Sequence, residues 1–354
     1  MLSSLRLMNF RCFPQLKVDL SGGTTVFIGE NAQGKTSILE AVCVLLRLHS
    51  PRTHRMGRMV RMGEAGFGVA GRVGDSDLQV RHQPGRGGGT LLACDGVDVP
   101  TSRDYLSGGE LIVWMGNEDL ELVRGPAEAR RHYLDFICGQ LDARYRRALS
   151  RYRRAVKARN FLLKKVRPDE GEIAAYTSLL IEEGAMIQEV RHEVAEGLVA
   201  PARDSQKAVS GRDEALQLSY RPSGSLRLPE AFEQAREAEL RQRQTVVGPH
   251  RDELLIEING MSAADYASEG QQRTAALALK LAQGALLESR GGRLPLYLLD
   301  DIFGELDASR RNALLTHLPR SSQKLITTTS LDWLRELDGV DRFRVRDATV
   351  SRER

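Results

Sequence analysis

The fold is decided by residues 25–37, which read TVFIGENAQGKTS. Residues 29–36 match the phosphate-loop pattern G-x-x-x-x-G-K-[ST]. An apolar run at residues 26–28 precedes the pattern, and a helical apolar pattern beginning at Ile38 follows it. A strand, a loop and a helix in this order aim backbone N–H groups and a helix dipole at one anion. A chance match is the alternative, and about one chain in a hundred of this length would match the loop pattern at random.

Each part of this loop has an expected task. Lys35 is expected to reach the β- and γ-phosphates of a nucleotide, and the Thr36 hydroxyl is expected to ligate Mg²⁺. The glycines let successive backbone N–H groups point at phosphate oxygens. The candidate nucleotide-binding residues of the loop are Gly29, Glu30, Asn31, Ala32, Gln33, Gly34, Lys35, Thr36 and Ser37.

Composition places the chain among soluble globular proteins. Its 354 residues suffice for two domains or one large one, and 28% of them are charged. The cysteines are far apart and form no C-x-x-C pair, which argues against a zinc site or disulfide scaffold and for a reducing compartment. The N-terminus lacks a signal-peptide pattern, and no stretch reaches the roughly 18 apolar residues of a membrane span. We therefore expect a cytoplasmic protein without a membrane partner.

The order of patterns predicts an α/β fold with an inserted helical arm. Period-two alternation predicts strands within residues 2–28 and at 69–73, 78–81 and 91–99, with a hairpin turn at 95–96. Two helical patterns follow, one through residues 145–163 and one ending near Val199, before Pro201; a break at 167–171 separates them. Strand patterns resume near residue 254. We therefore predict a discontinuous head of residues 1–115 and 245–354, and an arm of residues 116–244.

Charge on the arm is uneven. Residues 130–167 hold 13 Arg or Lys and two acids, a net +11, so the remaining chain carries −7. A focused basic strip is expected of a protein that binds a phosphate backbone independently of sequence. Eight acids within residues 169–196 could instead neutralise the strip inside the hairpin. The candidate DNA-binding residues are Arg146, Arg147, Arg153, Arg154 and Lys157.

A second set of candidate residues follows the arm. Ser268 and Gly270 precede a helical pattern at residues 274–287, where free N–H groups could face an anion. An apolar strand at 295–299 then ends in Asp300 and Asp301, at the edge where parallel sheets bind ligands. Asp300 is expected to hold Mg²⁺ through water, and Asp301 to orient or deprotonate the attacking water. The alternative is that the two aspartates only terminate the strand.

This order of motifs resembles the ATP-binding-cassette heads of SMC-type DNA ATPases, and more narrowly the RecF family of bacterial recombination mediators. The resemblance covers nearly the whole chain. The phosphate loop is shared with many enzymes, whereas GPHRD and GQQRT are more specific. The matching segments are residues 9–11 (NFR), 29–36, 134–135, 140–145, 158–160, 162–164, 248–252 (GPHRD), 270–274 (GQQRT) continuing to 276, and 298–301 (LLDD).

The resemblance implies an ATP- and Mg²⁺-dependent homodimer. In it, Ser268, Gly270 and Gln271 of one subunit meet the γ-phosphate held by Lys35 of the other, and Arg11 contacts nucleotide. It implies a DNA-dependent ATPase that binds single-stranded and gapped duplex DNA, with RecR and RecO as partners. Its implied role is recombinational repair and replication restart, helping to load RecA at gaps and supporting the SOS response.

Three departures qualify the resemblance. Residues 116–120 (GNEDL) and 124–127 (RGPA) differ from the usual family runs where the lobes join. The third departure is Glu269, which brings a carboxylate to the turn at residues 268–271, called the signature turn below. Residues 327–330 (TTTS) lack the histidine of transporter heads, which predicts slow hydrolysis. A transporter-type ATPase subunit and a non-catalytic ATP-binding scaffold are the competing classes. The basic arm argues against the first, and the Asp300–Asp301 pair against the second.

Overall fold

The computed structural model describes residues 1–85, 87–167, 169–224, 227–330 and 339–353. The chain divides into two compact units. Unit 1 contains Met1–Asn117 and Gly291–Arg354, and unit 2 contains Glu118–Arg290. Each unit has its own sheets and helices, and each is described by itself below.

An antiparallel sheet forms one layer of unit 1, with strand order β2-β1-β4-β5-β6-β7. The side chains of β1 alternate, so that Leu5 and Leu7 are buried while Arg6 is exposed. The predicted strands and the hairpin at residues 95–96 are confirmed. The strands are β1 (Leu2–Phe10), β2 (Phe13–Asp19), β4 (Phe67–Val73), β5 (Ser76–Gln83), β6 (Gly89–Cys94) and β7 (Val97–Val99).

A second sheet of unit 1 has the order β15-β14-β3-β13-β12-β8. All neighbours in it are parallel except β14 and β15. All residues of β3, β12 and β13 except Thr24 are buried, because both faces of these strands are covered. The strands are β3 (Thr24–Ile28), β8 (Ile112–Gly116), β12 (Leu296–Asp300), β13 (Lys324–Thr328), β14 (Asp341–Arg346) and β15 (Thr349–Arg352).

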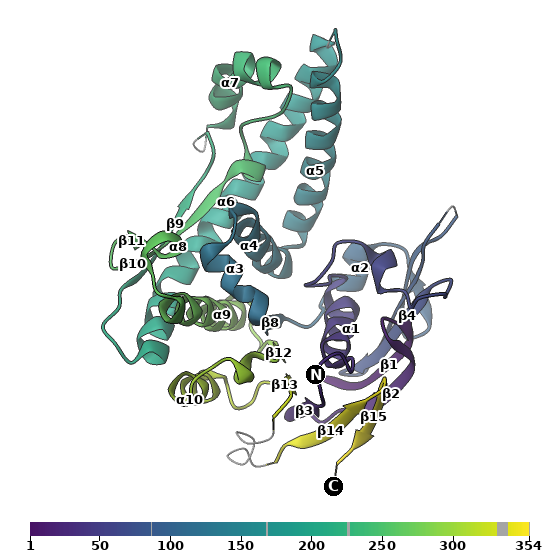
Figure 1. Cartoon of the computed structure of the whole chain (residues 1–354). Coiled ribbons are helices and arrows are strands. Elements are labelled where there is room, and N and C mark those ends of the chain that lie inside the picture. Colours follow the sequence, from purple (N-terminus) through teal and green to yellow (C-terminus); the bar gives the residue numbers. More distant parts are fainter. Residues whose placement is uncertain (86, 168, 225–226, 331–338, 354) are drawn as a thin grey trace. The chain divides into compact units, whose positions relative to one another are not determined.

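Helix α1 (Lys35–Arg47) is the central helix of unit 1 (Figure 1). It packs against β1, β4 and β5 of the first sheet and against β12 and β13 of the second. All of its residues except Thr36 are buried, as expected of a helix covered all round. The other helices in the described part of unit 1 are η1 (Met56–Met59), α2 (Ser102–Leu106), η4 (Ile302–Gly304) and α10 (Ala308–His317).

Two long helices form the arm of unit 2. Helices α5 (Ala143–Leu163) and α6 (Glu170–Ser210) pack side by side along the hairpin, as Figure 1 shows. Pro168, part of the predicted break, lies outside the described residues. Neither α6 nor any other helix in the described part of the chain is long and apolar enough to cross a membrane. The packing of α5 against α6 confirms the predicted αα-hairpin.

The end predicted for the second arm helix is wrong. Helix α6 continues through Pro201 to Ser210, because Leu198, Ala202 and Val209 extend the same buried face beyond the proline. A proline inside a helix removes one hydrogen bond. Packing of an amphipathic face, which supplies most of the stability of helices in proteins, outweighs that loss here.

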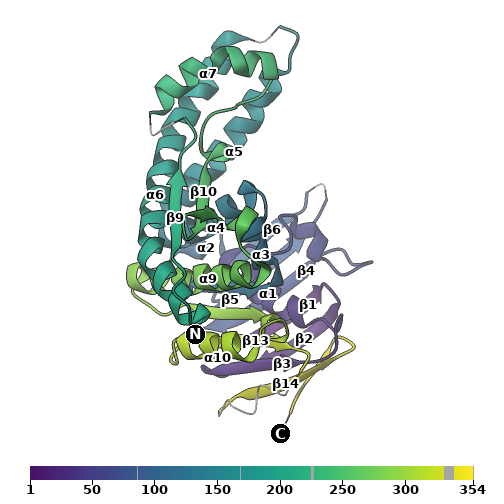
Figure 2. The same ribbon diagram turned by 60° about the vertical axis from the view of Figure 1, so that its left-hand side comes forward.

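The boundary predicted at residue 245 also needs correction, since residues 245–290 belong to unit 2. The reason is the pairing of β10 (Glu253–Ile258) with β9 (Leu216–Arg221) over six residues, while β9 lies along α6 (Figure 2). Local alternation marks a strand but does not identify its partner. The other elements of unit 2 are η2 (Asn117–Asp119), which begins at the boundary, α3 (Leu120–Arg124), α4 (Ala127–Leu141), α7 (Leu228–Gln242), η3 (Pro249–Arg251), β11 (Met261–Ser262), α8 (Ala263–Tyr266) and α9 (Glu269–Gly291).

A buried arginine joins the elements of unit 2. Arg191 on α6 donates to Asp135 (2.7 Å), to Asp252 (3.0 Å) and to the Pro249 carbonyl (2.6 Å). It also donates to the Tyr145 hydroxyl at 3.0 Å. Burial alone would lower the pKa of Arg191, but Asp135 and the other anionic groups around it raise that pKa well above its ordinary value. Helices α4, α5 and α6 and the turn before β10 thus share one ionic centre.

Replacing this arginine tests its role. We expect Arg191→Met to lower the free energy of unfolding by about 3–5 kcal/mol, because it leaves two buried carboxylates without their cation. Urea unfolding followed by circular dichroism measures the loss. The control is Arg203→Met, whose side chain is 64% exposed and pairs with the exposed Asp204; its expected cost is below about 0.5 kcal/mol. Equal costs for the two variants would contradict a central role for Arg191.

Candidate nucleotide site

The phosphate loop joins β3 to α1. Gly34 has φ +102°, and a Cβ at this position would lie 2.6 Å from Cys12 Sγ, so only glycine fits. Within the described chain no side chain caps the N-terminus of α1. Its first N–H groups are therefore available to an anion. Glu30, Asn31 and Ala32 form the exposed part of the loop.

Lys35 is held on the inside of the loop. Its Nζ donates to the carbonyl oxygens of Gly29 and Glu30, each at 2.8 Å. Burial lowers the pKa of Lys35, while the charges of Asp301 and Asp300 oppose this shift. The ammonium group is therefore bound by the loop carbonyls and lies near the two carboxylates. This is the position expected of a phosphate-binding lysine in a phosphate loop.

Asp300 meets the loop through a hydroxyl. Thr36 Oγ1 donates to Asp300 Oδ1 at 2.8 Å, and Thr327 Oγ1 donates to the same oxygen at 2.7 Å. Hydroxyl and carboxylate oxygens are the ligands that Mg²⁺ prefers, and Mg²⁺ in such sites uses only one or two protein groups beside phosphates and water. Thr36 and Asp300 therefore fit a magnesium ion.

Asp301 has an unusual backbone and an unused oxygen. Its φ of +51° is rare for a residue other than glycine, and its N–H donates to Thr327 Oγ1 at 3.0 Å. Among the described residues, its buried Oδ1 has no hydrogen-bond partner. Burial raises the pKa of Asp301, the Lys35 charge opposes this, and Glu305 adds to it. Unit 1 therefore supplies no donor to one carboxylate oxygen of Asp301 among its described residues.

Thr327 and Glu40 are two residues whose roles the sequence analysis missed. Thr327 lies opposite Asp300 in the parallel register of β12 and β13, so the strand pairing itself could have identified it. Glu40 is fully buried and accepts from Arg11 Nε at 2.8 Å, while Arg11 Nη1 donates to the Arg58 carbonyl at 2.9 Å. The sequence signal for Glu40 was a single charged residue within the otherwise apolar stretch 38–46.

The signature turn lies in unit 2, whereas Lys35, Thr36, Asp300 and Asp301 lie in unit 1. At the start of α9 the Ser268 and Gln271 side chains each accept from the other's backbone N–H, at 3.3 and 2.9 Å. The Glu269 carboxylate pairs with Arg273 at 2.9 Å, one turn along the helix. A carboxylate in this turn would repel a phosphate, and the guanidinium of Arg273 partly neutralises it.

The five candidate DNA-binding residues have different environments. Arg147, Arg154 and Lys157 are exposed on α5 and have no carboxylate partner in the described part of the chain. Arg153 pairs with Asp135 at 2.9 Å, and Arg146 donates to the Gly139 carbonyl. The acids of α6 neutralise the strip only in part, through Glu183 with Arg151 and Glu172 with Lys165.

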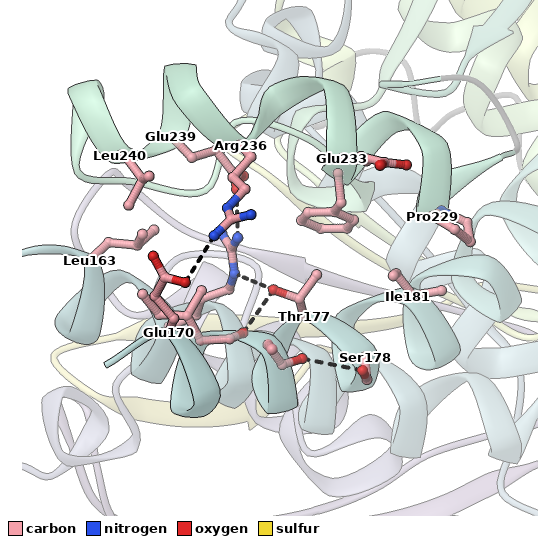
Figure 3. Close-up of a pocket in the computed structure, with 14 residues that line it drawn as sticks. Leu163, Glu170, Thr177, Ser178, Ile181, Pro229, Glu233, Arg236, Glu239 and Leu240 are labelled. Atoms are coloured by element: carbon pink, nitrogen blue, oxygen red, sulfur yellow. Dashed lines mark hydrogen bonds and ion pairs between the residues drawn. The ribbon is translucent and has the colours of Figure 1, made fainter. Parts of the chain in front are cut away.

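A cavity of about 420 Å³ lies in unit 2 among α5, α6 and α7. Figure 3 shows Pro229 of α7 facing Ile181 of α6 at one end of the cavity, and Leu240 of α7 facing Leu163 of α5 at the other. Four of the charged groups in its lining form two pairs, Arg236 with Glu170 at 3.0 Å and buried Arg159 with Glu239, and Glu233 is exposed. The lining is mostly apolar and contains no phosphate-loop residue, so this cavity is not the nucleotide site.

The fold and the site define a P-loop ATPase head of the ATP-binding-cassette type. A family model described as an AAA domain matches residues 4–61. The Smc head domain of Pyrococcus furiosus shares the fold, with a TM-score of 0.56 at 18% identity over 99% of this chain and 95% of that one.

More specific relatives cover nearly the whole chain. The DNA replication and repair protein RecF of Thermosynechococcus vestitus is 38% identical, covering 93% of this chain and 91% of the relative. That of Symbiobacterium thermophilum is 37% identical, covering 99% and 97%. The structure of a recombination mediator protein RecF with ATP superposes with a TM-score of 0.90 at 30% identity, covering 100% and 97%. The chain belongs to the RecF family of DNA replication and repair proteins.

Thr327 offers a test of the site. Thr327→Val keeps the shape but removes the hydroxyl that orients Asp300 and receives the Asp301 N–H. We expect ATP turnover to fall about tenfold or more, since about 1.4 kcal/mol of lost orientation suffices for that factor. The Mg²⁺ concentration for half-maximal phosphate release should rise as well.

The matched control is Thr327→Ser, which keeps the hydroxyl and should retain most of the turnover. If the Thr327→Val variant, the Thr327→Ser variant and the unmodified chain need the same Mg²⁺ concentration for half-maximal phosphate release, Thr327 does not orient Asp300.

Proposed function

We propose that this protein is an ATP-dependent DNA clamp of recombinational repair, which closes as a homodimer on ATP and opens on hydrolysis. The observation that carries the proposal is the Thr36–Asp300 hydrogen bond, which joins the phosphate loop to the end of a parallel strand. Family membership supports ATP as the nucleotide, since a relative superposes in a structure with ATP. The basic arm supports DNA as the second ligand.

Different residues of unit 1 have different roles in the proposed hydrolysis of ATP. Lys35 and the N–H groups of the loop bind the phosphates, and Thr36 with Asp300 would hold Mg²⁺. When bound, Mg²⁺ neutralises charge that develops on the phosphates. Asp301 positions the attacking water and accepts its proton at the unpartnered Oδ1. Because residues 327–330 supply no histidine to the γ-phosphate, the proposed turnover is slow.

Dimerisation completes the phosphate site in this proposal. The start of α9 lies beside the exposed Ser268, and a second copy would bring this turn, with the positive end of the helix dipole, to the γ-phosphate. Gly270 and Gln271 would lie in the same contact. ATP then becomes part of the interface, and its hydrolysis removes the charge that the helix start binds. Family membership and the basic arm argue against a transporter subunit, and the Asp300–Asp301 pair argues against a non-catalytic scaffold.

DNA binding is assigned to the exposed face of α5. Arg147, Arg154 and Lys157 recur at helical spacing and would contact backbone phosphates of single-stranded or gapped duplex DNA. Three such contacts on duplex imply a salt slope of about −2.7 per arm. RecR and RecO as partners, RecA loading at gaps and support of the SOS response are proposed from family membership, and a relative is described within the RecFOR pathway.

Asp301→Asn tests the cycle. The amide keeps the shape of the side chain but cannot take a proton, so ATP stays bound and the dimer stays closed. We expect anisotropy of a labelled gapped duplex to report ATP-dependent binding that is tighter in Asp301→Asn than in the unmodified chain. Size-exclusion chromatography with light scattering should find dimers with ATP and monomers with ADP. Monomers at every ATP concentration would refute the trapped dimer.

Two variants control this experiment. Lys35→Ala should abolish DNA-stimulated phosphate release, and equal turnover in this variant would end the enzyme assignment. The triple variant Arg147→Ala/Arg154→Ala/Lys157→Ala should weaken DNA binding and flatten its salt dependence. Arg203→Ala/Lys207→Ala/Arg212→Ala removes the same charge from exposed positions elsewhere in unit 2 and should bind normally. Equal DNA binding with ATP and ADP would mean that the arm binds passively and that no ATP-closed clamp exists.

A further inference from the structure

The turn at residues 248–252, GPHRD, is used by neither the nucleotide site nor the exposed face of α5. It contains η3 and leads into β10. Gly248 has φ +114°, and a Cβ there would lie 2.4 Å from the Tyr152 hydroxyl oxygen. No other residue fits this position without moving α5. The backbone of the turn is therefore held tightly against the arm.

The last residue of the turn is fixed from inside. Asp252 is fully buried, and its carboxylate accepts from Arg191 at 3.0 Å and from Gln188 at 2.8 Å. The Ser223 N–H and the Tyr220 hydroxyl donate to the same carboxylate. Four donors around one buried carboxylate leave it a single orientation. Its charge is balanced by Arg191 inside unit 2 and does not reach the surface.

His250 fixes the middle of the turn. Its Nε2 lies 3.0 Å from the Thr245 carbonyl and its Nδ1 lies 2.8 Å from the Tyr152 hydroxyl. A carbonyl can only accept, so Nε2 carries the proton and Nδ1 accepts from tyrosine. Burial lowers the pKa of His250 to about 4, so the ring is neutral at pH 7. The turn therefore adds no titrating charge of its own near neutrality.

Arg251 is the exception in this locked turn. It is the turn's exposed residue, and its guanidinium makes no hydrogen bond or ion pair anywhere in the described part of the chain. Arg131 of α4 donates to the carbonyl of Asp252, the residue after Arg251, at 2.8 Å. This contact brings a second guanidinium to the same turn. The acid that follows, Glu253, is held by Arg130 at 2.7 and 3.1 Å.

Few carboxylates at this surface therefore compete with a bound anion for the guanidinium groups of Arg251 and Arg131. Glu128 is exposed one turn before Arg131, and it lies 3.8 Å from His132. Asp252 and Glu253 are both engaged by buried or half-buried arginines. What remains at the surface is a guanidinium on a rigid turn with a second guanidinium beside it.

We propose that Arg251, with Arg131 beside it, is a preformed site for one phosphodiester group of the DNA backbone. The inference rests on the proposed function and deepens it, since it adds to the arm a contact built on a rigid turn. A planar guanidinium binds two phosphate oxygens at once. Holding its backbone in place before binding reduces the ordering cost that a flexible surface arginine would bear.

The experiment measures affinity for a labelled gapped duplex with ATP, over a series of salt concentrations. Arg251→Ala should weaken binding about tenfold, as expected for a charged hydrogen bond. It should also reduce the slope of log K against log salt by about 1. Arg251→Lys keeps the charge but not the two-pronged geometry, so it should keep the slope and lose a few-fold in affinity. Two duplexes of unrelated sequence should show the same losses.

Two further variants separate positioning from charge. Tyr152→Phe removes the hydrogen bond to His250 and loosens the turn, so affinity should fall a few-fold with an unchanged salt slope. Arg212→Ala removes an exposed arginine of unit 2 far along the sequence from the turn and should bind like the unmodified chain. Thermal unfolding midpoints of Arg251→Ala and the unmodified chain should coincide, because the side chain is exposed.

The outcomes distinguish this inference from the function on which it rests. If the unmodified chain fails to bind the duplex with ATP, the proposed function and this site both fall. If it binds and Arg251→Ala binds with the same affinity and slope, only the site falls. If Arg251→Ala weakens binding of labelled ATP and leaves DNA affinity unchanged, the anion is a nucleotide phosphate and the phosphodiester assignment is wrong.

Discussion

The pair of hydrogen bonds from Thr36 and Thr327 to Asp300 Oδ1 is the interaction on which the site depends. It exists because β3, β13 and β12 are adjacent and parallel, so that their carboxyl ends meet at one edge. Helix α1, which follows the phosphate loop, packs against strands of both sheets of unit 1, and this explains why almost all of its residues are buried. The architecture of unit 1 follows from bringing a phosphate loop and two carboxylates to the same place.

Unit 2 is organised around a different centre, the buried guanidinium of Arg191. Asp135 and Asp252 come from segments more than one hundred residues apart, and both carboxylates are buried where they contact Arg191. Buried ion pairs contribute little net stability compared with apolar packing. What they contribute here is placement, since one guanidinium determines where α4, α6 and the turn before β10 lie. Unit 2 is thereby a rigid support on which exposed charges have defined positions.

The basic character of the arm has two structural origins. Some of the arginines in residues 130–167 are building elements: Arg130 binds Glu253, and Arg159 is buried with Glu239. Others, such as Arg154, project from α5 into solvent. A net charge of +11 therefore overstates the positive surface, because part of it is neutralised inside unit 2. The exposed remainder is what a nucleic acid would meet.

Sequence alone determined what local chemistry encodes: the phosphate loop, the Asp300–Asp301 strand end, the strands around the hairpin at 95–96 and the αα-hairpin. Each depends on neighbours within a few residues. Tertiary structure decided that α6 passes Pro201, that residues 245–290 join unit 2, and that Thr327 orients Asp300 and Glu40 holds Arg11. These depend on which distant segment supplies a packing surface or a hydrogen-bond partner. Periodicity reveals that a face is buried, but the contact that buries it is made by residues far away in the chain.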